Sequence, residues 1–483
     1  MNSNEVNDNS QLNILLVELG SDIWTAGITE NLQIKHRFNV FGTGTNHPDI
    51  GHKFSDFLVR GNPHESGLDL TEDIKNFTID KHLYAEINCF EGATLRMLDR
   101  VDGFRLWQRN DLSKRRSYVF REASFWSYFL EEKHIDAVVF ANIPHEVHDF
   151  IIYNLCKARN IPTLIFFHTF NVDTFAFTIS ESVEAVGGHA FPSNLKSSIK
   201  FMEPVGFRSR LRDDFLGTGS SETVENFGVY QVSTKQQKDA IDKPVLAQAK
   251  KAGTRERIIS KLSRIRSNLE YVVKSKSSSL PRAFVFFPLH VEPELAISPS
   301  GGHFEEQFEA VRFVASKLPC GWKVVVKEHP HQRGFGPRPI GFYKRFEAIP
   351  NVEFVKTELS SLELIAKSQA VATITGSAGI EAVRLGKPSW VLGYPWYLSA
   401  PGVSPIDTSA DLEQAYADLN SFDAASDEVL DCYVDELLDS HFYGFIPGIP
   451  YHALSEEREY VHQATTENVV AVIAKWISNK FQH

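Results

Sequence analysis

Residues 370–393, AVATITGSAGIEAVRLGKPSWVLG, contain the pattern that decides the fold of this chain. An apolar run at 370–374 is followed by small residues, then by a helical pattern at 379–386, and then by a second apolar run at 389–393. Strands that are covered on both faces are continuously apolar, as these two runs are. The stretch therefore predicts a strand, a helix and a second strand in a parallel sheet.

The same alternation of apolar runs and helical patterns extends outward in both directions. Further strands are expected at 12–19, 136–143, 162–170, 283–289, 322–329 and 351–355, and further helices at 145–160, 304–318 and 361–368. Connections of this kind build open, doubly wound sheets with helices on both faces. We therefore predict an α/β protein with two Rossmann-like domains that face each other across a central cleft.

A chain of 483 residues is too long for one hydrophobic core. The pattern predicts a disordered lead-in at 1–10, an N-terminal domain at 11–235, a basic helical linker at 236–282, a C-terminal domain at 283–455, and a C-terminal helix at 456–483 that packs across the domains.

The composition is that of an ordinary globular protein, with 42% hydrophobic and 23% charged residues. A net charge of −11 argues against a dedicated nucleic-acid binder, which would show a basic surface. The cysteines Cys89, Cys156, Cys320 and Cys432 form no CxxC pair and are expected to be unpaired thiols in a reducing compartment.

The polar N-terminus does not have the pattern of a signal peptide, and no apolar run approaches the roughly 20 residues that span a bilayer. We expect a cytoplasmic protein, attached at most to the inner face of the cytoplasmic membrane. The basic linker at 236–282 is either a solvated helix or a contact with anionic lipid or a lipid-linked acceptor.

The turn after the strand at 370–374 is the first candidate for ligand binding. Thr375, Gly376, Ser377 and Ala378 would let a ligand approach the backbone and would offer N–H groups and hydroxyls to an anion. Glu381 lies one helical turn beyond Ser377, where a carboxylate could accept hydrogen bonds from ribose hydroxyls. An ordinary tight turn with a solvated glutamate is the alternative.

Polar residues also follow the strand at 322–329. Lys327, His329, Pro330 and Arg333 lie at its carboxyl end, which is where ligands bind in open α/β sheets. Lys327 and His329 could neutralise a leaving phosphate, and His329 could donate a proton to it. The alternative is a surface turn that is rich in hydrogen-bond donors.

The segment PLHVEPE, at 288–294, is the third polar strand end. Glu294, or else Glu292, could act as a nucleophile or base or could stabilise oxocarbenium charge. His290 could orient a carboxylate, and Ser298 and Gly301 belong to a glycine-containing loop that follows. Solvated turn residues are the alternative.

In the first half of the chain, Asn142, His145 and Glu146 follow the strand at 136–143. They would face the cleft from the other side, where His145 with Glu146 could deprotonate an acceptor hydroxyl. Helix capping and packing would explain these residues equally well.

No pattern predicts a metal site, because the histidines form no HExxH and the adjacent Asp213 and Asp214 lie in a charged, non-strand context. A monophosphate leaving group held by His, Lys and Ser does not need a metal ion to spread its charge. We therefore expect no cofactor apart from the donor substrate.

The segments FFPLHVEPE (286–294), LPCGWKVVVKEHP (318–330) and TITGSAGIEAVRLGKPSWVLGYPWY (373–397) together resemble the capsule polysaccharide biosynthesis family of bacterial glycosyltransferases. That family includes transferases of Kdo and other nonulosonic acids from CMP-activated donors. The resemblance implies a GT-B fold with CMP on the C-terminal domain. It also matches His329-Pro330 to phosphate contact, Thr375 to Ser377 to the family's Ser-containing turn, and Glu381 to its helix glutamate.

Kdo-transferring relatives carry Gln and Asp in the stretch where this chain has His290 and Glu294, so the resemblance leaves the sugar open. The expected function is a metal-independent transfer of a nonulosonic acid or Kdo from a CMP donor to a capsule or lipopolysaccharide acceptor. The alternatives are a UDP- or GDP-sugar GT-B transferase, an enzyme like UDP-GlcNAc 2-epimerase, and a non-catalytic subunit for glycan assembly.

Overall fold

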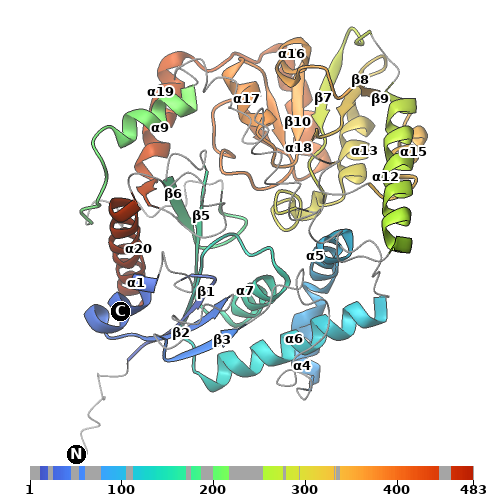
Figure 1. Cartoon of the computed structure of the whole chain (residues 1–483). Coiled ribbons are helices and arrows are strands. Elements are labelled where there is room, and N and C mark those ends of the chain that lie inside the picture. The colour runs from blue at the N-terminus through green and yellow to red at the C-terminus, as the bar shows by residue number, and fades with distance from the viewer. Residues whose placement is uncertain are drawn as a thin grey trace, which may run out of the picture.

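The computed structural model shows two α/β units, each built on its own sheet (Figure 1). It describes residues 11–19, 26–44, 54–59, 78–104, 112–169, 176–186, 199–216, 254–275, 279–292, 294–330, 332, 338–444 and 458–481. The predicted lead-in at 1–10 and part of the predicted linker lie outside these residues.

The first sheet is a doubly wound sheet with an antiparallel extension. Its strands run in the order β13 (Phe442–Tyr443), β6 (Ala176–Ser180), β5 (Thr163–Phe167), β4 (Ala137–Phe140), β1 (Asn13–Val17), β2 (Asn39–Gly44) and β3 (Asp56–Val59). The five strands from β5 to β3 are parallel, whereas β6 and β13 join antiparallel.

Helices cover both faces of this sheet because successive strand residues point to opposite sides. One face packs against α4 (Lys81–Asn88), α5 (Glu91–Phe104), α6 (Leu112–Glu132) and α7 (Val147–Arg159). The other face packs against α1 (Ala26–His36) and α20 (Arg458–Phe481). Leu15 and Val17 of β1 face the first group, and Ile14 and Leu16 face the second.

The second sheet is entirely parallel over its described strands. Its order is β12 (Val403–Pro405), β11 (Ser389–Val391), β10 (Ala370–Thr373), β7 (Phe284–Pro288), β8 (Lys323–Lys327) and β9 (Val352–Val355). Read from β9, the strands follow the order third, second, first, fourth, fifth, sixth, which is that of the dinucleotide-binding fold.

Helices also lie on both faces of the second sheet. On one side are α12 (Thr254–Lys274), α13 (Gln307–Lys317), α15 (Phe342–Arg345) and α18 (Ser409–Ala417); on the other are α16 (Ser361–Lys367) and α17 (Ala378–Arg384). Three short 3-10 turns complete this part of the chain: Gly302–Phe304, Phe346–Ala348 and Asp418–Asn420. The prediction of two doubly wound α/β domains is confirmed.

The chain returns to the first sheet before residue 455, the limit that the sequence suggests for the second domain. After α19 (Asp427–Asp439), β13 pairs with β6, and α20 then packs on the first sheet. An apolar cluster joins the domains, because α9 (Phe207–Leu216) and the start of α20 share it with Ile380 and Tyr397 of the second domain. Among the described residues, no helix is both long and apolar enough to cross a membrane.

Ile473 tests how much the last helix contributes to the first domain. Its side chain is fully buried between α20 and the first sheet. Ile473→Ala should lower the free energy of unfolding by about 2–5 kcal/mol because it leaves a cavity. Ile34→Ala, at an exposed position of α1, should change it by less than about 0.5 kcal/mol in the same urea titration. Equal effects of the two substitutions would contradict this packing.

Candidate functional site

The candidate site lies at the switch point of the second sheet, between β7 and β10. The chain leaves β7 toward β8 and leaves β10 toward β11, so the segments after these neighbouring strands diverge. A crevice for a ligand forms at such a point, beyond the carboxyl ends of the strands. The structure brings His290, which follows β7, and Thr375, which follows β10, into direct contact at this point.

His290 is a buried, neutral side chain that holds the turn after β10. Its Nε2 accepts a hydrogen bond of 3.1 Å from the backbone N–H of Thr375. Burial, together with the positive charges of His329 and Arg338, lowers the pKa of His290 to about 3. The ring therefore orients a backbone turn, whereas the sequence suggests that it orients a carboxylate.

Several hydrogen-bond donors of this turn are already paired within the protein. The Thr375 hydroxyl donates to the carbonyl of Ala296 at 2.6 Å, and the Gly376 N–H donates to the Thr373 hydroxyl at 3.1 Å. A Cβ at Gly376 would lie 3.0 Å from the Thr373 hydroxyl oxygen. Close packing within the protein is therefore one reason for the small residue here, and the Thr375 hydroxyl faces the protein rather than a ligand.

Ser377 and Glu381 lie together on the first turn of α17, as the spacing predicts. The Ser377 hydroxyl donates to Glu381 Oε1 at 2.9 Å. Burial raises the pKa of Glu381, although Ser377, Arg384 and Lys327 oppose this shift. Ala378 is the first residue of α17.

Lys327 lies close enough to Glu381 to interact with it electrostatically, but its ammonium group is held by α16. Its Nζ donates to the Leu359 carbonyl at 2.6 Å and to the Ser361 hydroxyl at 2.9 Å. Burial lowers the pKa of Lys327, and the charge of Glu381 opposes the shift. Lys327 therefore supplies positive charge behind Glu381.

The end of β8 places His329 close to His290, and Pro330 is exposed beside it. The His329 N–H donates to Glu328 Oε1 at 2.6 Å, which fixes the start of this loop. Arg333, the remaining residue predicted for this strand end, lies outside the described residues.

Arg338 is the centre of the site's polar network, and no sequence pattern pointed to it. Its guanidinium is fully buried and donates to both carboxylate oxygens of Glu328 at 2.9 Å, to Glu292 at 2.6 Å and to the His290 carbonyl at 2.6 Å. The hydroxyl of Tyr343 also donates to Glu328. Arg338 therefore ties the ends of β7 and β8 together.

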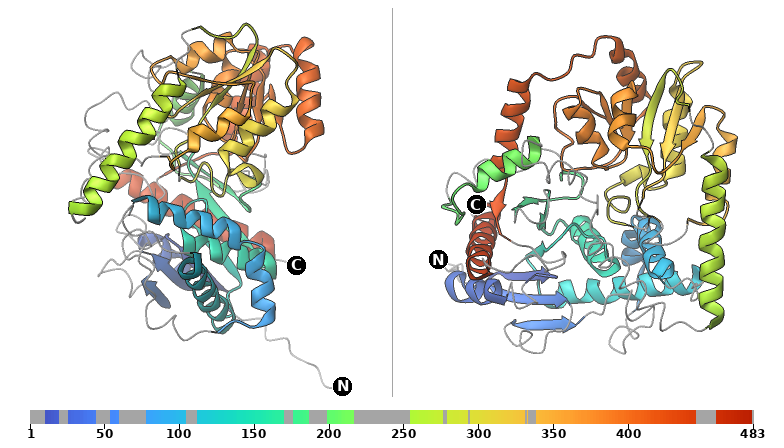
Figure 2. Two further views of the ribbon diagram at one scale, coloured as in Figure 1. Left: turned by 90° about the vertical axis from the view of Figure 1, so that its right-hand side faces the viewer. Right: turned by 45° about the horizontal axis from the view of Figure 1, so that its top comes forward.

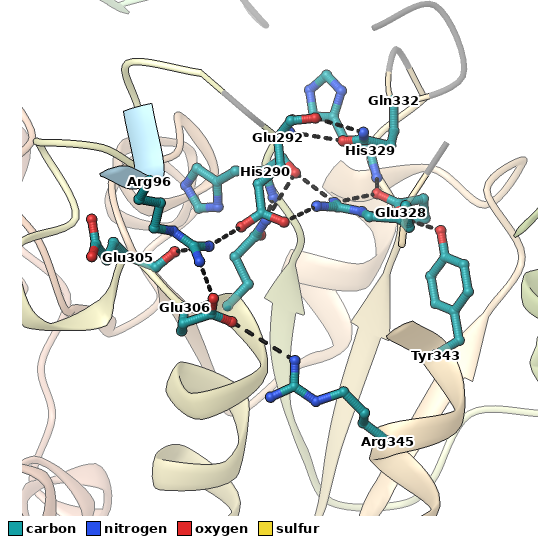
Figure 3. Close-up of polar contacts among 12 residues, drawn as sticks. Arg96, His290, Glu292, Glu305, Glu306, Glu328, His329, Gln332, Tyr343 and Arg345 are labelled. Atoms are coloured by element: carbon teal, nitrogen blue, oxygen red, sulfur yellow. Dashed lines mark hydrogen bonds and ion pairs between the residues drawn. The ribbon is translucent and has the colours of Figure 1, made fainter. Parts of the chain in front are cut away.

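Glu292 connects this network to the N-terminal domain. Its second carboxylate oxygen accepts from Arg96 of α5 at 3.1 Å, and Arg96 also donates to the Glu305 carbonyl at 2.9 Å and pairs with Glu306 (Figure 3). Because both oxygens of Glu292 face arginines, its negative charge is already neutralised. This makes Glu292 a poorer candidate for a reactive carboxylate than Glu294.

Glu294 lies in a tight turn that begins the next helical segment. Its Oε2 accepts from the Ala296 N–H at 2.9 Å. Ser298 donates to Glu305 at 3.1 Å, and a Cβ at Gly301 would lie only 2.4 Å from the carbonyl oxygen of Ile297. Ser298 and Gly301 thus shape the segment that carries Glu294.

The N-terminal wall of the site is the segment after β4. His145 Nδ1 lies 2.6 Å from the Ile143 carbonyl, and its Nε2 lies 3.6 Å from Glu146. Asn142 accepts from the Ile143 N–H at 2.8 Å. Leu295, the neighbour of Glu294, packs against the apolar cluster that contains Ile143, so the two walls meet.

A second buried charge cluster lies behind this wall. His148 Nε2 is 3.3 Å from Glu18, whose φ of 58° places it in the left-handed region at the end of β1. Burial alone would lower the pKa of His148, but the nearby carboxylates of Glu18, Asp149 and Glu122 outweigh burial and raise it to about 9. We missed Glu18, His148 and Asp149 because a helical pattern with interior His and Asp is indistinguishable from ordinary packing.

Two further observations concern metals and thiols. Among the residues that the structure describes, no group of three His, Cys, Asp or Glu side chains is placed to hold a metal ion. All four cysteines are free, and Cys156 is buried.

Comparison with known protein families gives a match for one part of the chain. Residues 212–437 match the family described as capsule polysaccharide biosynthesis protein. This part of the chain is therefore similar to the capsule polysaccharide biosynthesis family. The match contains every strand of the second sheet and confirms the resemblance predicted from the sequence. The comparison with curated proteins gave no match.

Several solved structures are similar to this chain at low identity. The beta Kdo 2,4 transferase KpsC of Thermosulfurimonas dismutans has 13% identity over 58% of this chain and 79% of its own, with a TM-score of 0.28. The beta Kdo 2,7 transferase KpsC of the same organism has 11% identity over 71% of this chain and 95% of its own, with a TM-score of 0.26. UDP-GlcNAc 2-epimerase of Neisseria meningitidis has 14% identity over 96% of this chain and 100% of its own, with a TM-score of 0.24. The fold assignment rests on this chain's own strand order.

Arg338 should be a major contributor to the stability of this protein. Arg338→Met leaves Glu328 buried without its counter-charge and should lower the free energy of unfolding by about 3–5 kcal/mol, measured by urea denaturation. Arg312→Met removes an exposed ion pair with Glu309 and should cost less than about 1 kcal/mol. If Arg338→Met unfolds no more easily than Arg312→Met, the network does not stabilise the domain.

The neutral state of His290 predicts a pH dependence. A histidine whose folded pKa is about 3, below its ordinary 6.5, stabilises the fold above pH 6.5 and loses that contribution as the pH falls toward 3. The wild type should therefore lose stability between pH 6.5 and about 4 more steeply than His290→Gln, by up to about 1.4 kcal/mol per pH unit. Urea denaturation at several pH values measures the difference. An exposed control, His303→Gln, should follow the wild type, and parallel curves for His290→Gln would exclude this role.

Proposed function

We propose that the protein is a glycosyltransferase of the GT-B class that transfers a nonulosonic acid or Kdo from a CMP-activated donor to a capsule or lipopolysaccharide acceptor. The observation that carries the proposal is the meeting of three strand ends at one switch point. His290, after β7, accepts from Thr375 in the turn that precedes the Ser377–Glu381 pair, and it lies close to His329 after β8. Glu294 accepts from the N–H of Ala296, whose carbonyl accepts from the Thr375 hydroxyl. The similarity of residues 212–437 to the capsule polysaccharide biosynthesis family supports the substrate class.

The donor's nucleotide would lie against the turn after β10. Thr375 and Gly376 already donate their N–H groups within the protein, so the phosphate would be met by His329 and by the hydroxyl of Ser377. The Ser377 hydroxyl would turn from Glu381 to the phosphate on binding. Glu381 would accept hydrogen bonds from the ribose hydroxyls. His329, and Lys327 behind Glu381, would supply positive charge that suits an anionic donor and leaving group without a metal ion.

The reaction would take place between the two domain walls. Glu294 is our choice for the reactive carboxylate, because Glu292 is held by Arg338 and Arg96. It would act on the anomeric carbon as the bond to the CMP phosphate breaks, or would accept the proton of the attacking hydroxyl. His145 with Glu146, on the opposite wall, would position or deprotonate the acceptor hydroxyl.

The proposal also includes the cellular setting. The donor and the growing glycan would be met in the cytoplasm, at the inner face of the membrane. We also predict that the basic segment 236–282 contacts that membrane.

CMP release from a panel of CMP-sugars, measured with wild type and Glu294→Gln, tests the proposed reaction. The wild type should release CMP with at least one CMP-nonulosonate in the presence of a glycan acceptor. Glu294→Gln should lower kcat by about 10²–10⁴-fold, because it removes a proton-accepting or nucleophilic group. Glu292→Gln is the matched control, and its main effect should be on stability. Undiminished turnover by Glu294→Gln would exclude the role of this carboxylate.

Thermal-shift profiles separate the remaining alternatives, because a ligand that binds the native state raises its melting temperature. CMP should give a larger shift than UDP or GDP, and Glu381→Gln should reduce it. A larger shift with UDP would favour a UDP-sugar enzyme, and no shift with any nucleotide would favour a non-catalytic subunit.

A further inference from the structure

The outer face of α12 carries a continuous stripe of exposed apolar side chains. Its members are Leu262, Ile265, Leu269, Val272 and Val273, with 60%, 46%, 57%, 55% and 55% of their surface exposed. Their spacing of three and four residues places them on one side of the helix. The helix lies at the outline of the molecule in each view (Figures 1 and 2). The exposure of the five side chains shows that this side of the helix faces away from the domain.

The opposite face of α12 already fixes the helix to the second domain. Tyr271 is buried, donates to the Val355 carbonyl and accepts from the Glu328 N–H at 3.1 Å. Glu270 accepts from the Gly341 N–H at 3.1 Å, and Lys274 pairs with Glu347. The apolar stripe therefore contributes nothing to this attachment, and its exposure requires another explanation.

The charges around the stripe indicate what it contacts. Residues 254–274 contain Arg255, Arg257, Lys261, Arg264, Arg266 and Lys274 against only Glu256 and Glu270, in a chain whose net charge is −11. At 100° per residue, the exposed Lys261 and Arg266 border the stripe on its two sides. Apolar residues flanked by bases are typical of helices that lie in the interface of an anionic membrane.

A second copy of the chain is a weaker candidate for the occupant. Two α12 stripes that packed together would bring basic flanks against each other, whereas paired helices are stabilised by opposite charges beside the apolar seam. Glu270, an acid next to this face, is already engaged with Gly341 and lies 3.6 Å from Arg266. Charge complementarity thus favours an anionic lipid surface.

We propose that this stripe docks the protein on an anionic membrane, with its five apolar side chains among the headgroups and Lys261 and Arg266 against the phosphates. The proposed function includes a membrane contact, and this inference assigns that contact to a defined surface of the protein. It does not depend on the donor or on any catalytic residue, so vesicle binding and CMP release can fail independently.

Sedimentation of the full-length protein with vesicles tests the docking surface. The protein should bind vesicles of phosphatidylcholine with phosphatidylglycerol, should not bind phosphatidylcholine alone, and should be released by salt. Lys261→Gln/Arg266→Gln should weaken binding by about 25-fold, since each base near an anionic surface contributes about fivefold. Leu269→Ser/Val273→Ser should weaken it by at least about tenfold, because apolar burial is lost.

Matched exposed positions elsewhere provide the controls. Ile34→Ser/Val429→Ser and Arg116→Gln/Arg312→Gln should bind as the wild type does, and all variants should keep its melting temperature. The proposal is overturned if the wild type does not bind anionic vesicles, or if the α12 variants bind as well as the controls. It is also overturned if the wild type is a dimer that does not bind vesicles and the α12 variants are monomers.

Discussion

The buried guanidinium of Arg338 is the interaction on which the candidate site depends. A charge at full burial is tolerated only when it is paired and its hydrogen bonds are satisfied. Here Glu328 and Glu292 supply the negative charge, and the carbonyl of His290 takes a further hydrogen bond. Because Glu292 and His290 follow β7 and Glu328 follows β8, this one cation fixes the ends of two neighbouring strands relative to each other.

Two consequences follow from the same network. Burial, together with the charges of His329 and Arg338, lowers the pKa of His290 and keeps it neutral, so that its Nε2 accepts from Thr375 and holds the turn that carries Ser377. Glu292 is also shared with Arg96 of the N-terminal domain. The arrangement of the two domains and the shape of the site are therefore linked through a single carboxylate.

The sequence predicted the parts of this structure that depend on local patterns. Continuous apolar runs marked the strands, and polar residues at their carboxyl ends marked the switch point, because parallel strands place these ends at one edge. Arg338 and Arg96 were not predictable in this way. Arg338 lies in the irregular segment GPRPIG, and Arg96 reaches partners about 200 residues away, so no local period reports either contact. The direction of the Thr375 hydroxyl was likewise decided by a distant neighbour, Ala296.

The central claim is that the ends of β7, β8 and β10 form one nucleotide site. A crystal structure of the protein with CMP tests it most directly. The account predicts that the phosphate lies within hydrogen-bond distance of Ser377 and His329, and that the ribose hydroxyls contact Glu381. Glu294 should then face the open side of the phosphate. Ordered CMP on the first sheet, or remote from the turn at 375–378, would contradict it.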